Sequence, residues 1–383
     1  MKTSFLKNSF LLILVSFSIC SCSKNSDDGG SENILENLTF SIDTASVKVG
    51  EEVFRAEEYY AFDLSKDRST VYFFYDPEKE IHAIDLKTLT LKSRTKFEQE
   101  GPNGVPSFVS DFQAFSDGSF FMGDFMGGGF YSLSGEKLQP VSFQKEDYIG
   151  VDSLEVTMVG NSVQFTSDRK GFVSLPVEFG KPMETLAAIN LDQKLAKAYG
   201  IPAMDITRNF QVTFQRENSS SFIGDYLRLA RANGLFFLTS ASTSDAYVYD
   251  AEKDSLRLVS FPHVLVPKQK TGEYIKEVDS REKQLDIAKA MSQEISFLEF
   301  FWDETRNKYF RFGKMNQQYT EENMPKSADV YLFVYDENLT LLGEKKLEGL
   351  RGISYFNFFS GGKFYAYHVT DEVPGFVVLD FEF

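Results

Sequence analysis

The chain has 383 residues, with 40 Lys and Arg against 56 Asp and Glu, and a formal net charge of −16. A field of that sign opposes binding to nucleic acid, so we expect no nucleic-acid partner. Both cysteines, Cys20 and Cys22, lie near the N-terminus, which excludes a disulfide or a Cys-rich metal site within a folded domain. The 39 Phe and 18 Tyr, with only 11 Pro, predict an all-β protein with many half-buried strands.

Residues 1–21 have the layout of a lipoprotein signal peptide. Two lysines precede a largely apolar run at residues 10–19, which is too short to span a bilayer. Cys22 follows Ser21, and a small residue is what the peptidase requires before an acylated cysteine, whereas a bulkier isoleucine precedes Cys20. We therefore predict lipidation of Cys22, and removal of the leader with its two lysines would change the charge to −18.

Residues 22–36 are predicted to form a flexible acidic tether between the lipid and the domain, because they are polar and rich in Ser, Asp and Gly. The segment resembles the short acidic export signals that send some lipoproteins of Gram-negative bacteria to the cell surface. We expect an outer-membrane protein, anchored by its lipid and displayed at the cell surface. The alternative is a plain tether on a protein that faces the periplasm.

Residues 37–383 carry a repeated hairpin pattern. In each copy an apolar strand runs into Asp, Asn or Ser, a few polar residues follow, and a Leu opens the returning strand. Five complete copies and one that lacks its returning strand occur at residues 82–89, 130–138, 187–195, 247–256, 332–339 and 376–380. Their turn residues are separated by 49, 56, 60, 86 and 44 residues, which is typical of propeller blades of about four strands.

The last copy ends with the chain, so its outer strand must come from elsewhere. An unpaired edge there would invite aggregation, and residues 38–49 alternate well enough to pair with residues 376–383. We therefore predict an all-β fold: a six-bladed β-propeller whose N-terminal strand closes the C-terminal blade, preceded by a lipoprotein signal peptide. A β-sandwich or jelly roll is the alternative, although neither explains the periodic spacing.

Two segments, residues 202–220 and 262–293, do not fit a blade. Within the second insertion, residues 279–282 resemble a capping box that opens a short helix. Propeller connectivity would place both segments, residues 100–106 and the loop at 315–327 on one face. Because insertions gathered on one face usually mark the binding side, we expect the ligand there.

The lipobox, the acidic tether and the six degenerate repeats together resemble the six-bladed, TolB-like propeller lipoproteins of Gram-negative bacteria. Within them the chain is most similar to the family named domain of unknown function 4221. The likeness is carried by Glu-Gly-Pro-Asn-Gly-Val at residues 100–105 and by Trp-Asp-Glu-Thr-Arg-Asn-Lys-Tyr-Phe-Arg-Phe at residues 302–312. This resemblance implies a fold and an envelope location, but it implies no activity and no catalytic residues.

Three residues are candidates for ligand binding: Glu100, Asn103 and His263. Glu100 and Asn103 would offer a carboxylate and an amide near the channel mouth, although the same residues would equally serve to turn the chain. The long insertion could carry His263 over the channel. The other histidines, His82 and His368, fall within predicted strands and are interpreted as structural, so no metal site is predicted.

We interpret the protein as a binding or scaffolding module for a glycan, a peptide or an envelope partner, without a cofactor. The alternative is a hydrolase of lactone, ester or glycan bonds that holds a divalent ion such as calcium in the central channel, for which this acidic chain offers many carboxylates. No Gly-x-Ser-x-Gly elbow occurs, which disfavours a serine hydrolase. The basic residues Arg306, Lys308, Arg311 and Lys314 are expected to point outward and balance acidic neighbours.

Overall fold

A computed structural model describes residues 33–50, 59–150, 156–178, 183–216, 219–354, 356–370 and 373–383. The predicted signal peptide, Cys22 and the first part of the predicted tether lie outside these residues. Among the described residues, no helix is both long enough and apolar enough to cross a membrane.

The described residues form six four-stranded antiparallel sheets, numbered here in chain order, and a three-stranded accessory sheet. The first sheet contains β2 (Tyr59–Leu64), β3 (Thr70–Tyr75), β4 (Glu80–Asp85) and β5 (Thr90–Lys96), and the second contains β6 (Asp111–Ala114), β7 (Phe120–Asp124), β8 (Gly127–Tyr131) and β9 (Lys137–Ser142). The third contains β10 (Gln164–Phe165), β11 (Gly171–Ser174), β12 (Thr185–Asn190) and β13 (Leu195–Gly200), and the fourth contains β16 (Leu227–Ala232), β17 (Leu235–Ser240), β18 (Thr243–Asp250) and β19 (Ser255–Val259). The fifth contains β21 (Ser296–Asp303), β22 (Lys308–Tyr319), β23 (Pro325–Tyr335) and β24 (Leu341–Lys346), and the sixth contains β25 (Asn357–Ser360), β26 (Lys363–Thr370), β27 (Val373–Glu382) and β1 (Thr39–Ser46).

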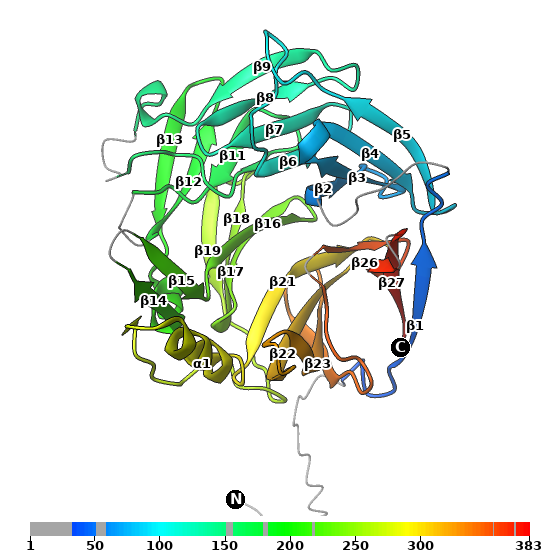
Figure 1. Ribbon diagram of the computed structural model, residues 1–383, viewed down its shortest axis with the longest axis vertical. Helices are drawn as coiled ribbons and strands as arrows, with labels where there is room; N and C mark the ends of the chain where they lie inside the picture. Colours follow the sequence, from blue (N-terminus) through cyan, green and yellow to red (C-terminus); the bar gives the residue numbers. More distant parts are fainter. Residues whose placement is uncertain are drawn as a thin grey trace, which may run out of the picture. The chain divides into compact units, whose positions relative to one another are not determined.

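The six sheets pack face to face in a closed circuit. Six clusters of buried apolar side chains each draw on two consecutive sheets, and one of them joins the sixth sheet to the first. In that closing cluster the rings of Phe73 and Tyr367 lie 5.0 Å apart. Figure 1 shows β2, β6, β16 and β21 toward the centre and β1, β5 and β9 toward the outside. The first strand of each sheet is therefore its inner strand.

The predicted pairing of the first strand with the last is confirmed. β1 runs antiparallel to β27, from Thr39 opposite Glu382 to Ser46 opposite Gly375. The five complete hairpin repeats are also confirmed, because each forms the third and fourth strands of one of the first five sheets. The periodic pattern therefore located the sheets correctly.

The two insertions fold together beside the fourth and fifth sheets. They form the 3-10 helix η5 (Pro202–Phe210), the accessory sheet of β14 (Gln211–Gln215), β15 (Ser220–Gly224) and β20 (Glu277–Val278), and the helix α1 (Arg281–Met291). The predicted cap is present, since Ser280 Oγ accepts a hydrogen bond from Lys283 N. The β22–β23 hairpin reaches this segment through a 3.0 Å hydrogen bond from Tyr319 Oη to Ser292 Oγ. We call η5, the accessory sheet and α1 the accessory segment.

The tether was predicted to span residues 22–36, but its predicted end lies too late in the sequence, because Asn33 and Leu35 already belong to the folded domain. Asn33 Nδ2 donates to Glu344 O at 3.0 Å, and Glu344 N donates back to Asn33 Oδ1 at 3.1 Å. Leu35 is 0 % exposed within the core between the fifth and sixth sheets. An apolar side chain and a paired amide therefore fix residues that composition alone assigned to a flexible segment.

Candidate functional site

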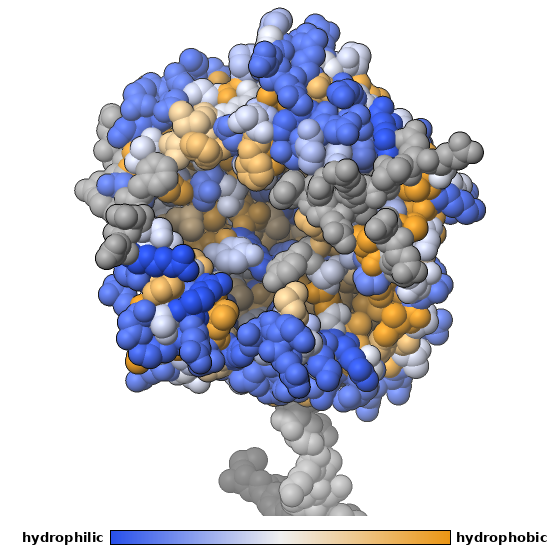
Figure 2. Space-filling model, in the orientation of Figure 1, coloured by the Kyte–Doolittle hydropathy of each residue, from blue (hydrophilic) through white to orange (hydrophobic). Residues whose placement is uncertain are grey.

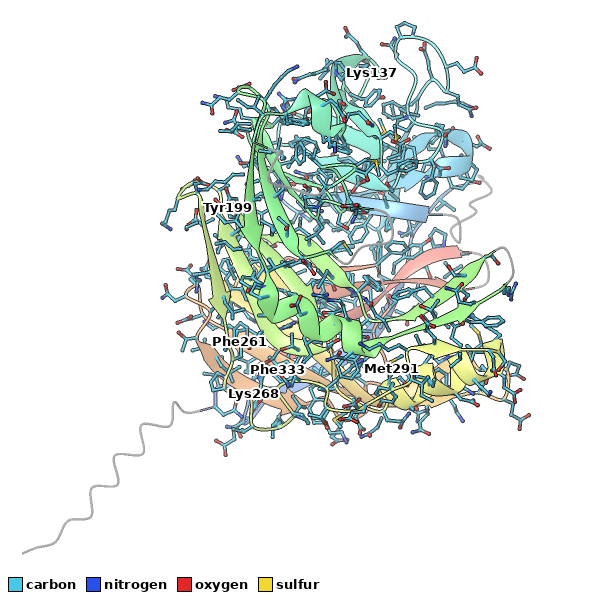
Figure 3. All side chains as sticks on the ribbon, turned by 90° about the vertical axis from the view of Figure 1, so that its left-hand side faces the viewer. Lys137, Tyr199, Phe261, Lys268, Met291 and Phe333 are labelled. Carbon is cyan, nitrogen blue, oxygen red and sulfur yellow. The ribbon has the colours of Figure 1, made fainter. Side chains whose placement is uncertain are left out.

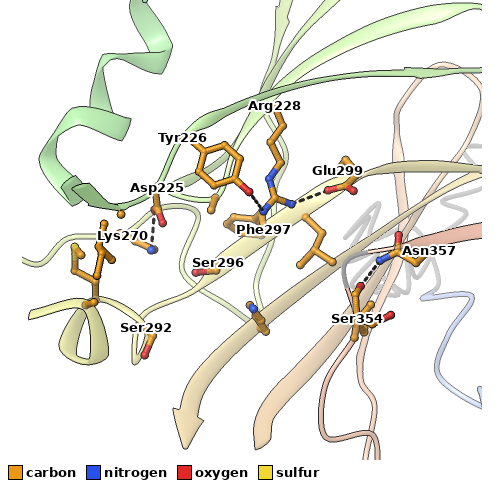
Figure 4. A pocket seen from close by; sticks show the side chains of 18 of the residues that line it. Asp225, Tyr226, Arg228, Lys270, Ser292, Ser296, Phe297, Glu299, Ser354 and Asn357 are labelled. Atoms are coloured by element: carbon orange, nitrogen blue, oxygen red, sulfur yellow. Dashed lines mark hydrogen bonds and ion pairs between the residues drawn. The ribbon is translucent and has the colours of Figure 1, made fainter. Parts of the chain in front are cut away.

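A cavity of about 270 Å³ opens where the inner strands of three sheets meet the accessory segment. Its polar walls include Arg228 of β16, Glu299 of β21 and Asn357 of β25, with Asp225 and Lys270 from the adjoining connections. Figure 4 shows these groups arranged around the space, and Figure 2 shows this face of the molecule hollowed toward its centre. We call this cavity the inner pocket.

Two ion pairs organise the inner pocket. Arg228 Nη1 lies 2.9 Å from Glu299 Oε2, and its Nη2 donates to Tyr226 Oη at 3.1 Å. Lys270 Nζ lies 2.7 Å from Asp225 Oδ2, and the Lys270 side chain is only 2 % exposed. Charge-assisted hydrogen bonds of this kind hold four of the lining side chains in place without a ligand.

A third cation, Lys314 of β22, has no such partner. Its side chain is partly buried in the pocket wall, and its ammonium makes no hydrogen bond or ion pair with any described residue. Burial lowers the pKa of Lys314, and the nearby charges of Arg228 and Lys270 lower it further, although Asp225 opposes them. The inner pocket thus presents three cations against two carboxylates in a chain whose net charge is −16.

Asn357 provides an unused acceptor on the same wall. The residue is 5 % exposed, and its Nδ2 donates to Ser354 O at 2.6 Å. Its Oδ1 is buried and has no hydrogen-bond partner among the described residues. Leaving a buried acceptor unsatisfied costs about 1–3 kcal/mol, so a ligand or water that donates to this oxygen would recover that free energy.

The predicted candidates Glu100 and Asn103 do not reach the inner pocket. Asn103 Oδ1 accepts a 3.1 Å hydrogen bond from Lys137 N, at the start of the outer strand β9. Tyr131 Oη donates to Gly104 O at 2.9 Å, which ties the same turn to the second sheet, and Glu100 is exposed. The geometry places Asn103 at the outer edge of the second sheet and not at a channel mouth.

His263 is buried, contrary to the expectation that it lies over a channel. Its side chain is 0 % exposed, with Nδ1 3.4 Å from Glu344 Oε2 and Nε2 3.3 Å from Tyr335 Oη. Burial lowers the pKa of His263, so the neutral imidazole is favoured within the core between the fourth and fifth sheets. His82 is buried beside Glu80 as a structural residue, whereas His368 is exposed on β26.

The sequence led us to expect outward-pointing basic residues in the fifth sheet, and this expectation is wrong for Arg311, whereas Arg306 does pair with an acidic neighbour, Asp303. Arg311 is 0 % exposed, donates from Nε to Leu298 O at 2.7 Å, and lies over the ring of Phe300 with its Cζ 4.7 Å from the centroid. Arg306 donates to Gly362 O at 2.7 Å, which links the fifth sheet to the sixth. Strand periodicity failed here because β22 is covered on both faces, so alternation does not separate buried from solvated positions.

Comparisons with known proteins identify a family and a solved member with a similar fold. The family model described as "Domain of unknown function (DUF4221)" matches residues 31–346. A solved member of that family from Bacteroides vulgatus is 13 % identical, with a TM-score of 0.63 over 90 % of this chain and 98 % of that one. A protein from Bacteroides fragilis is 8 % identical, with a TM-score of 0.49 over 90 % and 95 % of the two chains, and a luciferin-regenerating enzyme is 12 % identical, with a TM-score of 0.43 over 88 % and 98 %. No curated protein matches the chain. The chain belongs to the DUF4221 family and shares the all-β fold of its solved member.

Proposed function

We propose that this protein is a lipid-anchored, six-bladed β-propeller of the outer membrane whose inner pocket binds an acidic sugar unit. The observation that carries the proposal is the ammonium of Lys314, which is partly buried and unpaired with described residues beside two other cations. An anion entering the pocket would supply the missing charge partner. Burial and the two neighbouring cations disfavour the charged form of Lys314, and an anion beside it would relieve that effect.

The carboxylate of a uronic acid is the anion that we assign to Lys314. Arg228 and Lys270 are already paired with Glu299 and Asp225, so the pocket can accept one further negative charge without losing either ion pair. A sugar also carries hydroxyl donors, and Asn357 Oδ1 needs a donor. The volume of about 270 Å³ is below the range of drug-sized sites, which fits a single sugar unit.

The anchor and the location are proposed from the leader sequence. Cys22 follows an apolar run and a small residue, as a lipoprotein signal requires, and an acidic segment follows it. A pocket for an acidic sugar suits a protein displayed where envelope or extracellular polysaccharides are present. We retain display at the cell surface as the proposal and a periplasm-facing orientation as its alternative.

A metal-dependent hydrolase is less well supported. Among the described residues, no group of three or more His, Cys, Asp or Glu side chains is arranged to hold a metal ion. The two carboxylates of the inner pocket, Asp225 and Glu299, are each engaged by a cation instead. The donor arrangement therefore does not fit a calcium centre in this pocket, and we derive no hydrolytic step.

Titration calorimetry with glucuronate and galacturonate would test the proposed function, with glucose as the neutral control. The variant Lys314→Met should weaken uronate binding at least tenfold, because it removes a charge-assisted hydrogen bond. The matched control, Lys308→Met, changes a lysine of the same strand that does not line the pocket and should leave binding unchanged.

Four results would contradict this proposal. Uronates that fail to bind at millimolar concentration would refute the assigned ligand class, and equal affinity of the Lys314→Met variant would refute the assigned site. Binding of a peptide through its C-terminal carboxylate, with glucuronate inactive, would reassign the ligand as a peptide. Loss of binding on chelation would favour the metal-dependent alternative.

A further inference from the structure

The first described residues are fixed at one corner of the domain, on the outer strand β24. The Asn33 side chain makes two hydrogen bonds with the backbone of Glu344, and Ile34 N donates to Leu342 O at 3.1 Å. The packing is close, since a Cβ atom added at Gly343 would lie 2.4 Å from Asn33 Oδ1. The N-terminal part of the chain therefore enters the domain at a defined point beside Glu344.

The same glutamate holds an apolar loop at that corner. Glu344 Oε1 accepts hydrogen bonds from Val264 N at 2.8 Å and from Leu265 N at 3.0 Å. With its backbone fixed in this way, the loop leaves Val264 84 % exposed and Leu265 48 % exposed. Val264 is the most exposed large apolar side chain among the described residues. We call residues 262–267 the apolar loop.

The segment that contains the apolar loop differs in charge from the whole chain. No acidic residue occurs between residues 261 and 272, although the chain carries 56 of them, and Lys268 is exposed directly after the loop. Figure 3 shows Lys268 near the edge of the domain, beyond Phe261 and Phe333. The loop exposes two apolar side chains, and the Glu344 carboxylate that accepts its backbone N–H groups is only 6 % exposed, so this surface can approach a layer of lipid phosphates.

We propose that Val264 and Leu265 insert into the interfacial layer of the bilayer to which Cys22 anchors the chain. This inference rests on the lipid anchor of the proposed function. Asn33 is the eleventh residue after Cys22. The tether that the composition predicts would have, at that length, a root-mean-square span of roughly 20 Å and a maximum of about 40 Å. The anchor thus keeps the corner that carries the apolar loop within reach of the membrane.

Because the lipid already provides attachment, the apolar loop would set the orientation of the domain. A free tether would let the domain rotate, whereas a second contact beside the point where the tether ends would hold one edge toward the lipid. The rigid hydrogen bonds to Glu344 suit this role, since a loop that is already ordered loses little entropy on insertion. A protein partner would be the competing occupant of this surface.

The experiment uses the full-length protein in vesicles of phosphatidylethanolamine and phosphatidylglycerol that contain spin-labelled lipids. Mass spectrometry first establishes whether Cys22 carries lipid. An environment-sensitive dye is then attached at Val264→Cys and, as the matched control, at Leu133→Cys, an exposed position (50 %) between β8 and β9 of the second sheet. We expect a blue shift and strong quenching at position 264 and neither change at position 133.

A second variant removes the apolar surface without the dye. Val264→Asp with Leu265→Asp should make the domain edge accessible to protease on the vesicle, and should weaken the residual vesicle binding of unlipidated protein about tenfold for each side chain. If Cys22 carries lipid and position 264 is not quenched, the membrane contact is wrong while the anchor stands. If Cys22 carries no lipid, both fail. Quenching that appears only after a protein partner is added would also overturn the inference.

Discussion

Asp111 offers a direct test of the packing around the inner strand β6. Its side chain is partly buried, with Oδ1 accepting from Val163 N at 3.0 Å and Oδ2 accepting from Ser110 Oγ at 3.0 Å. No cation is paired with it among the described residues. Burial raises the pKa of Asp111 to about 6, and the hydrogen bonds offset only part of that effect. The ionised carboxylate is therefore held in the domain at neutral pH at a cost.

The magnitude of that cost follows from the shift. A change from 3.8 to about 6 corresponds to about 3 kcal/mol, at about 1.36 kcal/mol per pKa unit. The pKa of Asp111 is higher in the folded state than in the unfolded state. Its contribution to the free energy of unfolding is therefore fully present below about pH 3.8, where the carboxyl group is protonated, and is lost as the pH rises through about 6. Asp111→Asn keeps an acceptor for Val163 N but cannot ionise. The variant should gain up to about 3 kcal/mol at pH 8.

Urea unfolding of the parent and the variant between pH 4 and pH 8 would measure this difference. The gain should shrink as the pH falls and vanish near pH 4. Asp117→Asn is the opposite control, because hydrogen bonds from Ser119 lower the pKa of this exposed carboxylate, so its loss should not stabilise the protein at neutral pH. An Asp111→Asn variant that is no more stable than the parent at pH 8 would refute the burial argument.

Three further changes test the domain. Leu35→Ala should lower the free energy of unfolding by about 2–5 kcal/mol, measured by urea denaturation, because the side chain is wholly buried. Arg311→Met should lower the free energy of unfolding by about 2–4 kcal/mol in the same assay, because it leaves the carbonyls of Leu298 and Ser244 without a donor. Arg311 links the fourth and fifth sheets through these two hydrogen bonds, and an unchanged urea midpoint would contradict that role. Burial acts to raise the pKa of Glu344, but the contact with His263 and two backbone N–H groups outweigh it and hold that pKa below its ordinary value. Ionised Glu344 therefore stabilises the folded protein above about pH 4.5, and this stabilisation is lost at lower pH. The variant Glu344→Gln should show a smaller decrease in the free energy of unfolding as the pH falls below that value. An unchanged decrease would contradict the role assigned to the Glu344 carboxylate.

The sheet order could be predicted because its signals are local or topological. Each hairpin repeat places an alternating strand, a turn and a second strand within a few residues, so it needs no knowledge of distant parts of the chain. The pairing of β1 with β27 followed from the need to cover an open edge, and residues 38–49 were the alternating segment available. The register of that pairing, from Thr39 opposite Glu382, was not predictable, because no turn connects the two strands.

The candidate site could not be predicted in the same way. Lys314 looked like one of several solvated charges, and only the packing of β22 against the accessory segment shows that it is partly buried beside Arg228. His263 lay in the long insertion and was expected over the channel, yet its ring packs among buried aromatic side chains. In both cases the environment is made by residues that lie far away in sequence.

The position of the inner pocket follows from the way the insertions break the repetition of the sheets. Six similar sheets in a closed circuit offer similar inner edges, and a single site requires something that distinguishes one edge from the others. Asp225 comes from the connection before the fourth sheet and Lys270 from the connection after it, so their 2.7 Å ion pair joins the two insertions at the pocket. Burying such a pair contributes little net stability, since desolvation offsets the attraction. The pair therefore adds little to folding but fixes both insertions around Lys314, which is the arrangement that the proposed ligand binding requires.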